Sequence, residues 1–249
     1  MSIDVNIVLQ LLVAFVVCSL IGLPSYRIRV VSLSGLLSGY VMGIGIIMTG
    51  GWGAFVVIMM FFVLSGLTTK FHYDKKKKRG IAEAAGGARG YKNVFGNGLV
   101  ALFFSALYLI YGGPVFIAAY MGAAASATCD TAGGEIGRLS KTDPFMITTF
   151  KRVPAGTDGA ISLLRKSAEV AICLILGAIA WAVGVPEGAL VGWKLMAVTM
   201  VGGFIGASMD SYLGATLETS RAWFSNNYTN FFCTVTGALA SVLAYYLLI

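Results

Sequence analysis

The chain has 249 residues, of which 57% are hydrophobic and only 12% are charged, and its formal net charge is +7. Soluble domains carry about a quarter charged residues, so this composition excludes a soluble globular protein and predicts an integral membrane protein with little soluble mass. The four cysteines are scattered without a CxxC or Cys/His pattern, which argues against a structural zinc site or a disulfide framework.

The apolar segments predict an all-α fold, a polytopic helical membrane bundle of about eight spans that forms a single integral membrane domain over residues 1–249. A spanning helix needs about 20 consecutive apolar residues. The predicted helices cover residues 5–23, 28–48, 51–69, 94–112, 113–128, 168–185, 190–209 and 230–248. Because Asp4 stands where a signal peptide would have a basic region, we expect the first apolar segment to be a permanent helix.

Three polar segments interrupt this series, at residues 70–93, 129–167 and 210–229. Two predicted spans separate each of these segments from the next, and two separate residues 24–29 from the first. If the first segment is a cytoplasmic loop, all three therefore lie on the cytoplasmic side, together with residues 24–29. These four segments hold every Lys and Arg of the chain except Lys194. Basic residues concentrate on the cytoplasmic side of membrane proteins. The charge asymmetry therefore predicts an N-terminus outside and a functional site on the cytoplasmic face.

Two acidic segments, each just past an apolar helix, resemble one another. GAAASATCDTAGGE covers residues 122–135 and GGFIGASMDSYLGA covers residues 202–215. In both, a Gly lies eight residues before an Asp, a hydroxyl residue follows the Asp, and a Gly comes four residues after it. Carboxylates at membrane depth are costly and usually functional. Since the predicted spans give both helices the same direction, the match suggests a parallel internal repeat that carries Asp130 and Asp210.

A third carboxylate stands close to the first aspartate. Asp130 and Glu135 are five residues apart, so they would not share a face of one continuous helix, but the intervening Gly133-Gly134 pair can break that helix and bring them together. Carboxylates with Thr and Ser hydroxyls form an oxygen-rich site suited to Mg²⁺ that carries substrate phosphates. We therefore predict Asp130, Glu135 and Asp210 as catalytic, metal-binding residues. The alternative is a helix C-terminus whose polar groups contact solvent.

Glycine-rich and basic segments can hold phosphate groups. Glycines around Arg89 let the backbone wrap a phosphate that the guanidinium grips, and a turn rich in Gly and Thr beside basic residues is typical of an anion-binding nest. No Walker A pattern occurs. Asparagines at the start of the last helix can contact nucleotide or metal, or can cap that helix. The predicted nucleotide- and phosphate-binding residues are Arg89, Lys92, Lys151, Arg152, Gly156, Thr157, Asn226, Asn227 and Asn230.

Over roughly residues 70–235, the chain resembles the transmembrane protein 19-like family, which has these segments in the same order: KRGIAEAAGGARGYKNVFGNG, DTAGGEIGRLSK, FKRVPAGTDGAIS, MDSYLGATLE and NNYTN. That family includes the plastid phytyl-phosphate kinase of tocopherol synthesis. The resemblance implies a phosphotransferase that moves a phosphoryl group from a nucleoside triphosphate, with CTP expected, to a membrane-held prenyl monophosphate such as phytyl or geranylgeranyl phosphate. Membrane lipid is a further expected partner, and no nucleic-acid partner is expected.

Two positions depart from the family pattern. The Gly133-Gly134 pair replaces the common Ala, Ser or Thr residues before the glutamate, and Glu218 stands where Gln is usual. Other functions stay open. A CTP-dependent cytidylyltransferase acting on a lipid phosphate would use the same groups. A secondary transporter would use Asp130 and Asp210 as its cation site, although carrier sites lie near the bilayer midplane. A scaffold without chemistry fits the many polar, glycine-rich segments least well.

Overall fold

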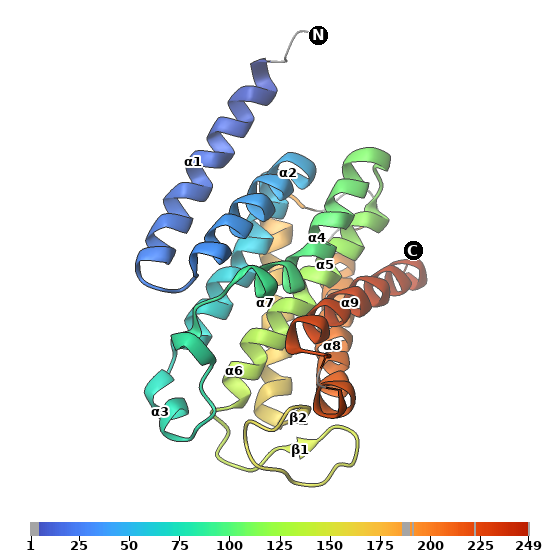
Figure 1. The fold of residues 1–249 in the computed structure, drawn as a ribbon. Helices are drawn as coiled ribbons and strands as arrows, with labels where there is room; N and C mark the ends of the chain where they lie inside the picture. Colours follow the sequence, from blue (N-terminus) through green and yellow to red (C-terminus); the bar gives the residue numbers. More distant parts are fainter. Residues whose placement is uncertain (1–4, 186–189, 191, 222, 249) are drawn as a thin grey trace.

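The computed structural model describes residues 5–185, 190, 192–221 and 223–248, and it is a bundle of long helices (Figure 1). The long helices are α1 Val5–Arg27, α2 Leu33–Lys70, α4 Tyr91–Tyr111, α5 Pro114–Thr128, α7 Leu163–Ala182, α8 Trp193–Leu213 and α9 Asn226–Leu248. The shorter elements are α3 Tyr73–Lys78, the 3₁₀ turn η1 Ala84–Gly87, the π-helical turns η2 Cys129–Gly133 and η3 Gly214–Glu218, α6 Gly134–Gly137, and an antiparallel pair of two-residue strands, β1 Phe145–Met146 and β2 Ala160–Ile161. This architecture confirms the predicted helical membrane bundle.

Helix α2 folds back on itself at Gly51, whose φ of 75° and ψ of −176° are not helical. A Cβ atom on Gly43 would lie 3.3 Å from the ring of Phe55, although the intervening twelve residues of a straight helix would rise about 18 Å. The two halves of α2 therefore correspond to the predicted helices 28–48 and 51–69. Figure 1 shows the first half leaving the end of α1 and the second half returning toward α3.

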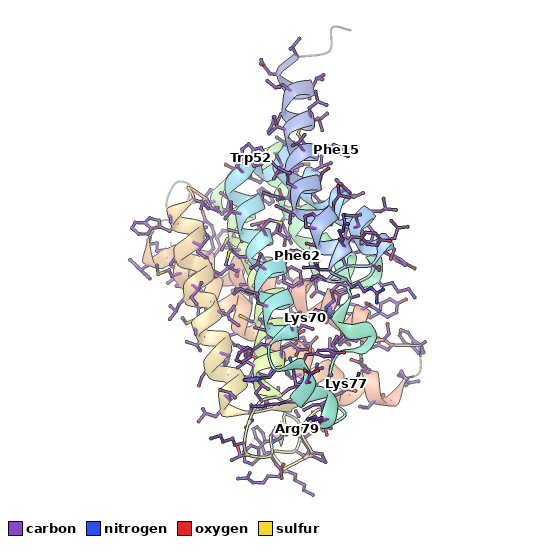
Figure 2. The ribbon with its side chains drawn as sticks, turned by 90° about the vertical axis from the view of Figure 1, so that its left-hand side faces the viewer. Phe15, Trp52, Phe62, Lys70, Lys77 and Arg79 are labelled. Carbon is purple, nitrogen blue, oxygen red and sulfur yellow. The ribbon has the colours of Figure 1, made fainter. Side chains whose placement is uncertain are left out.

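Apolar and basic side chains are separated along the bundle. Within the described ranges, α1, α2, α4 and α9 are long and apolar enough to span a membrane by length and composition, whereas α5, α7 and α8 are shorter or more polar. Figure 2 places Phe15 and Trp52 toward one end of the molecule, and Lys70, Lys77 and Arg79 toward the other. All the short elements after α2 gather near this basic end (Figure 1).

Helix α5 is the buried centre of the bundle. Every residue from Ile117 to Thr128 is buried. Its contacts with α8 and α9 depend on glycine: a Cβ atom on Gly202 of α8 would lie 2.6 Å from the Cα atom of Gly122, and a Cβ on Gly122 would collide with the carbonyl oxygen of Gly237 in α9. Small residues allow helices in a membrane to approach closely enough to gain extensive van der Waals contact.

Helices α5 and α8 run parallel and in register. Four residues after the contact just described, Gly206 of α8 meets the side chain of Ser126 in α5. Four residues further, the carboxyl groups of Asp210 and Asp130 interact. Both helices then pass into a π-helical turn, η2 after α5 and η3 after α8. The twin acidic segments thus lie side by side with equivalent residues facing one another, as a parallel repeat requires.

The glycine contacts predict a large effect of one added methyl group. We expect Gly122→Ala to lower the free energy of unfolding by about 1–3 kcal/mol, because the new Cβ would overpack a backbone carbonyl that cannot move alone. Gly39→Ala in α2 is the matched control, since a Cβ there would meet no atom within 4 Å. Thermal unfolding in detergent measures both, and an equal melting temperature for the two variants would contradict this packing.

Candidate active site

A polar cavity of about 140 Å³ lies at the basic end of the bundle, where α5 and α8 end and α7 and α9 begin. Its wall combines the two π-helical turns with the loops before α4 and α7. The predicted site residues that line it are Arg89, Asp130, Glu135, Gly156, Thr157, Asp210, Asn226 and Asn230. Five segments distant in the sequence therefore meet in one small, charged space.

Two aspartates face each other in this cavity. Asp130 lies in η2 and accepts a hydrogen bond from Nη2 of Arg165 at 2.9 Å. Asp210 lies in the last turn of α8 with only 8% of its surface exposed, and its Oδ2 atom has no hydrogen-bond partner among the described residues. The two carboxylates repel each other while Arg165 attracts both. Because Arg165 also pairs with Glu169 at 2.9 Å, this part of the site has a surplus of negative charge.

The first turns of α9 bring amide groups to the same place. Asn230 is 3% exposed, and its Oδ1 atom also has no hydrogen-bond partner in the described part of the chain. Asn226, one turn earlier, hydrogen-bonds with Glu218 of η3, and Thr229 donates to Oε2 of Glu218 at 3.0 Å. Burial raises the pKa of the Glu218 carboxyl above its ordinary value. Asn230 is therefore the asparagine that places a buried oxygen, without a hydrogen-bond partner in the described part of the chain, in the wall of the cavity.

The available oxygens fit a magnesium ion that is shared with substrate. Mg²⁺ is usually held by one or two carboxylates, with phosphates and water completing its coordination. Within the described ranges, Asp210 Oδ2 and Asn230 Oδ1 are buried without a hydrogen-bond partner, Asp130 interacts with Asp210, and all three residues line the cavity. Among the described residues, however, no three Asp, Glu, His or Cys side chains are grouped to hold a metal ion. The structure thus offers two carboxylates and an amide rather than a cage of three carboxylates.

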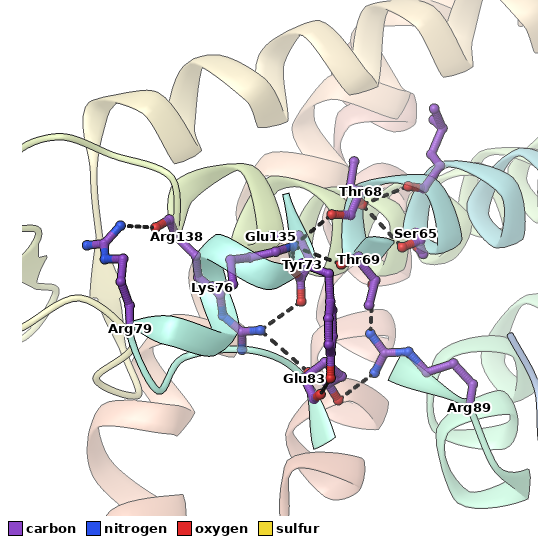
Figure 3. A network of polar contacts seen from close by, with 11 residues as sticks. Ser65, Thr68, Thr69, Tyr73, Lys76, Arg79, Glu83, Arg89, Glu135 and Arg138 are labelled. Atoms are coloured by element: carbon purple, nitrogen blue, oxygen red, sulfur yellow. Dashed lines mark hydrogen bonds and ion pairs between the residues drawn. The ribbon is translucent and has the colours of Figure 1, made fainter. Parts of the chain in front are cut away.

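Glu135 belongs to a different set of contacts (Figure 3). Its Oε2 atom forms an ion pair with Nζ of Lys76, and its Oε1 accepts from Nη1 of Arg138 at 2.7 Å. Lys76 is fully buried and also donates to the carbonyl oxygens of Thr68 and Thr69, each at 2.9 Å, at the end of α2. Both oxygens of Glu135 are engaged, so the structure does not group it with the aspartates as the sequence led us to predict.

A chain of ion pairs extends from Glu135 to the edge of the cavity (Figure 3). Arg138 Nη1 lies 3.5 Å from Oε2 of Glu83, and Glu83 Oε1 accepts from Nη1 of Arg89 at 2.9 Å. Nη2 of Arg89 is 3.4 Å from Oγ1 of Thr69. The side chain of Arg89 is 18% exposed. Glu83 thus holds a guanidinium at the cavity wall, where it can meet an anionic ligand.

Four predicted phosphate- or nucleotide-binding residues are not among the described residues that line the cavity. Lys92, Lys151 and Arg152 are exposed, and the guanidinium of Arg152 lies 4.9 Å from the ring centre of Phe145. The backbone of Asn227 packs against α4, where its carbonyl oxygen would meet a Cβ atom on Gly96. The structure therefore leaves these four residues outside the central group.

Sequence reasoning omitted two important basic residues. Arg165 contacts Asp130 directly, and it begins an i, i+4 pair with Glu169 at the start of an apolar helix, which is a recognisable signal. Lys76 is buried, whereas its neighbours Lys75 and Lys77 are exposed. Nothing in a run of four lysines distinguishes Lys76, so its role depends on the tertiary structure.

Comparison with known protein families gives a clear match. The family model described as "Integral membrane protein DUF92" matches residues 16–238. The chain belongs to the DUF92 family. This match, together with the similarity to the Arabidopsis thaliana proteins named PGR and VTE6, confirms the resemblance to the transmembrane protein 19-like proteins.

Relatives of this DUF92 protein occur in archaea, cyanobacteria and plants. An uncharacterized membrane protein of Methanocaldococcus jannaschii is 29% identical over 95% of each chain. One of Synechocystis is 30% identical, over 82% of this chain and 78% of its own. Protein VTE6, chloroplastic, of Arabidopsis thaliana is 28% identical over 85% of this chain and 64% of its own. No solved structure matches this chain.

Proposed function

We propose that this DUF92 protein is a Mg²⁺-dependent prenyl-phosphate kinase. It transfers a phosphoryl group from a nucleoside triphosphate, with CTP the expected donor, to a membrane-held prenyl monophosphate such as phytyl or geranylgeranyl phosphate. One observation carries the proposal: Asp210 Oδ2 and Asn230 Oδ1 are buried, have no hydrogen-bond partner among the described residues, and belong to side chains that line a polar cavity together with Asp130. Two similarities support the choice of acceptor. The chain is similar to VTE6, and it resembles a family that includes a plastid phytyl-phosphate kinase.

Each side chain has a defined role in this proposal. Asp130, Asp210 and Asn230 hold Mg²⁺, which when bound offsets the negative charge of the triphosphate. Arg165 fixes the orientation of Asp130 through its 2.9 Å hydrogen bond, and it is a positioning residue for the aspartates. The guanidinium of Arg89 binds the acceptor phosphate. The turn at Gly156, where φ is +90°, presents backbone toward the same cavity.

The reaction needs little proton chemistry from the protein. An oxygen of the prenyl monophosphate attacks the γ-phosphorus, and the bond between that phosphorus and the β,γ-bridging oxygen breaks. The products are a prenyl diphosphate and a nucleoside diphosphate. Because the attacking phosphate is already ionised near neutral pH, no strong general base is required, and positioning and charge neutralisation supply most of the catalysis. The basic end of the bundle faces the cytoplasm in this proposal, where nucleotide is present.

The direct test incubates purified protein with CTP, Mg²⁺ and a panel of prenyl monophosphates, followed by mass analysis of the products. We expect a prenyl diphosphate and CDP, and we expect EDTA to abolish both because the carboxylates alone repel the triphosphate. Pyrophosphate with a CDP-linked lipid would instead identify a cytidylyltransferase. If the protein turned over no nucleotide, and proteoliposomes containing it took up solute under an ion gradient, the results would support a transporter instead of a kinase.

A further inference from the structure

A second cavity, apolar and about 130 Å³ in volume, lies beside the polar one. Its walls come from α1, both halves of α2 and the first part of α4. Arg89 and Thr131 line both cavities. The polar site therefore adjoins an apolar space inside the membrane-spanning part of the bundle, and the two cavities share part of one wall.

The junction, where Arg89 and Thr131 line both cavities, has groups nearby that can bind an anion. Ser65 lies one helical turn before Thr69, whose Oγ1 atom is 3.4 Å from Nη2 of Arg89. Arg89 contributes its guanidinium, which is held there by Glu83 at 2.9 Å. Ser65 of α2 lines the apolar cavity, is only 6% exposed, and its Oγ atom has no hydrogen-bond partner within the described ranges. A buried hydroxyl without a partner is costly. A phosphate oxygen at the junction would satisfy it.

The interior of the apolar cavity has the form of a slot for a narrow hydrocarbon. Gly39 and Gly43 of α2 line it from one side, and a Cβ atom on Gly39 would meet no atom within 4 Å. Phe55 and Phe62 line it from the returning half of α2. From Ser65 near the junction to Phe55 at the far end, α2 rises about 15 Å. The slot has a charged end at Arg89 and an apolar end at Phe55.

We propose that this apolar cavity holds the isoprenoid chain of the acceptor, with its phosphate at Arg89 and Ser65 and its tail directed toward Phe55. The inference rests on the proposed kinase function and specifies where the substrate lies. Charge complementarity selects the occupant, because a single chain with one anionic end matches a slot with one cationic end, whereas a bilayer phospholipid brings two chains. The depth of the slot then limits the length of chain that the protein accepts.

The test fills the slot without touching the polar cavity. Gly39→Phe places a ring in the open space beside Gly39, and Gly39→Leu is the smaller alternative if the first variant does not fold. Leu37→Phe is the matched control, since Leu37 lies two residues away on α2 with 58% of its surface exposed. Thermal unfolding confirms that each purified variant is folded before any ligand is added.

The first readout is photolabelling with a geranylgeranyl monophosphate that carries a diazirine near the end of its tail. We expect labelled peptides of α1, α2 and α4 from the unchanged protein and from Leu37→Phe, and at least a tenfold loss of label in Gly39→Phe. Label confined to lipid-facing positions, or label that Gly39→Phe does not reduce, would overturn the inference. So would equal competition by geranylgeraniol and its monophosphate, because that result would mean that the phosphate adds nothing to binding.

The second readout is turnover with a twenty-carbon and a five-carbon prenyl monophosphate. We expect Gly39→Phe to lower turnover of the long acceptor at least tenfold more than turnover of the short one. The two readouts separate the proposals. If labelling depended on Gly39 but the protein showed no turnover, the proposed tail site would stand and the kinase proposal would be wrong. If Gly39→Phe left the turnover of both acceptors unchanged, the kinase proposal would stand and the proposed tail site would be wrong.

Discussion

Asp210→Asn is expected to lower phosphoryl-transfer turnover by about 100-fold or more, because it removes a negative charge that the proposed mechanism uses to hold Mg²⁺, the ion that would offset the charge of the triphosphate. The carboxyl is buried, its Oδ2 atom has no protein partner in the described part of the chain, and it faces Asp130. The substitution preserves shape, so the fold should persist. Turnover of CTP and geranylgeranyl monophosphate, measured over a range of Mg²⁺ concentrations, reports the loss.

Asp143→Asn is the matched control for this experiment. Asp143 lies on an exposed loop near the same end of the molecule, and the same chemical change there should leave turnover within twofold of the unchanged protein. If Asp210→Asn also retained full turnover with an unchanged Mg²⁺ dependence, Asp210 would not belong to the metal-binding group, and the proposed mechanism would fail at its first step.

Lys76→Met is expected to destabilise the protein by about 3–5 kcal/mol, the typical cost of leaving one partner of a buried ion pair without the other. Lys76 is fully buried and Glu135 is 3% exposed. The substitution would leave the Glu135 carboxylate with Arg138 as its remaining ionic partner, and it would also free two carbonyl oxygens at the end of α2. Thermal unfolding in detergent measures the loss.

Lys77→Met provides a close control, since Lys77 is the next residue of the same short helix and is exposed. Its melting temperature should stay near that of the unchanged protein. The double substitution Lys76→Met with Glu135→Leu should recover much of the lost stability, because replacing both members of a buried pair by apolar groups is often nearly neutral. Equal melting temperatures for the two lysine variants would show that the Lys76 ion pair contributes nothing.

The positions of the helices and the meeting of the two aspartates were predictable from the sequence. Apolar segments of membrane length define the helices, and the turn at Gly51 falls at the start of the second of two predicted helices, 28–48 and 51–69. The match between the two acidic segments places Asp130 and Asp210 at the same depth of two parallel helices. Small residues at equivalent positions then allow α5 and α8 to touch, which brings the acids into one cavity.

Helical periodicity alone could have predicted that Asn226 and Asn230 share one face of α9 and that Asn227 lies on another. Residues four apart share a face of a helix, whereas adjacent residues point about 100° apart. Asn226 and Asn230 accordingly line the cavity, whereas Asn227, whose backbone packs against α4, is not among the described residues that line it. The distinction follows from spacing and needs no tertiary information.

The contacts of Glu135 could not be predicted in the same way. The Gly133-Gly134 pair does not break the helix as the sequence led us to expect, because both glycines have right-handed helical φ and ψ angles and the helix continues from η2 into α6. Which cation Glu135 would meet depends on how the loop after α2 packs, and Lys76 stands 59 residues away in the sequence. A long-range ion pair of this kind leaves no local pattern.

The parallel contact between α5 and α8 has a consequence for how the site can be altered. Two identical half-length chains, joined by the same contact, would present two equivalent acids with identical surroundings. In this single chain, Asp130 has Arg165 as a hydrogen-bond partner, whereas Oδ2 of Asp210 has no partner in the part of the chain that the structure describes. Because both helices belong to one polypeptide, each acid has its own neighbours and can be changed separately, which a symmetric pair would not permit.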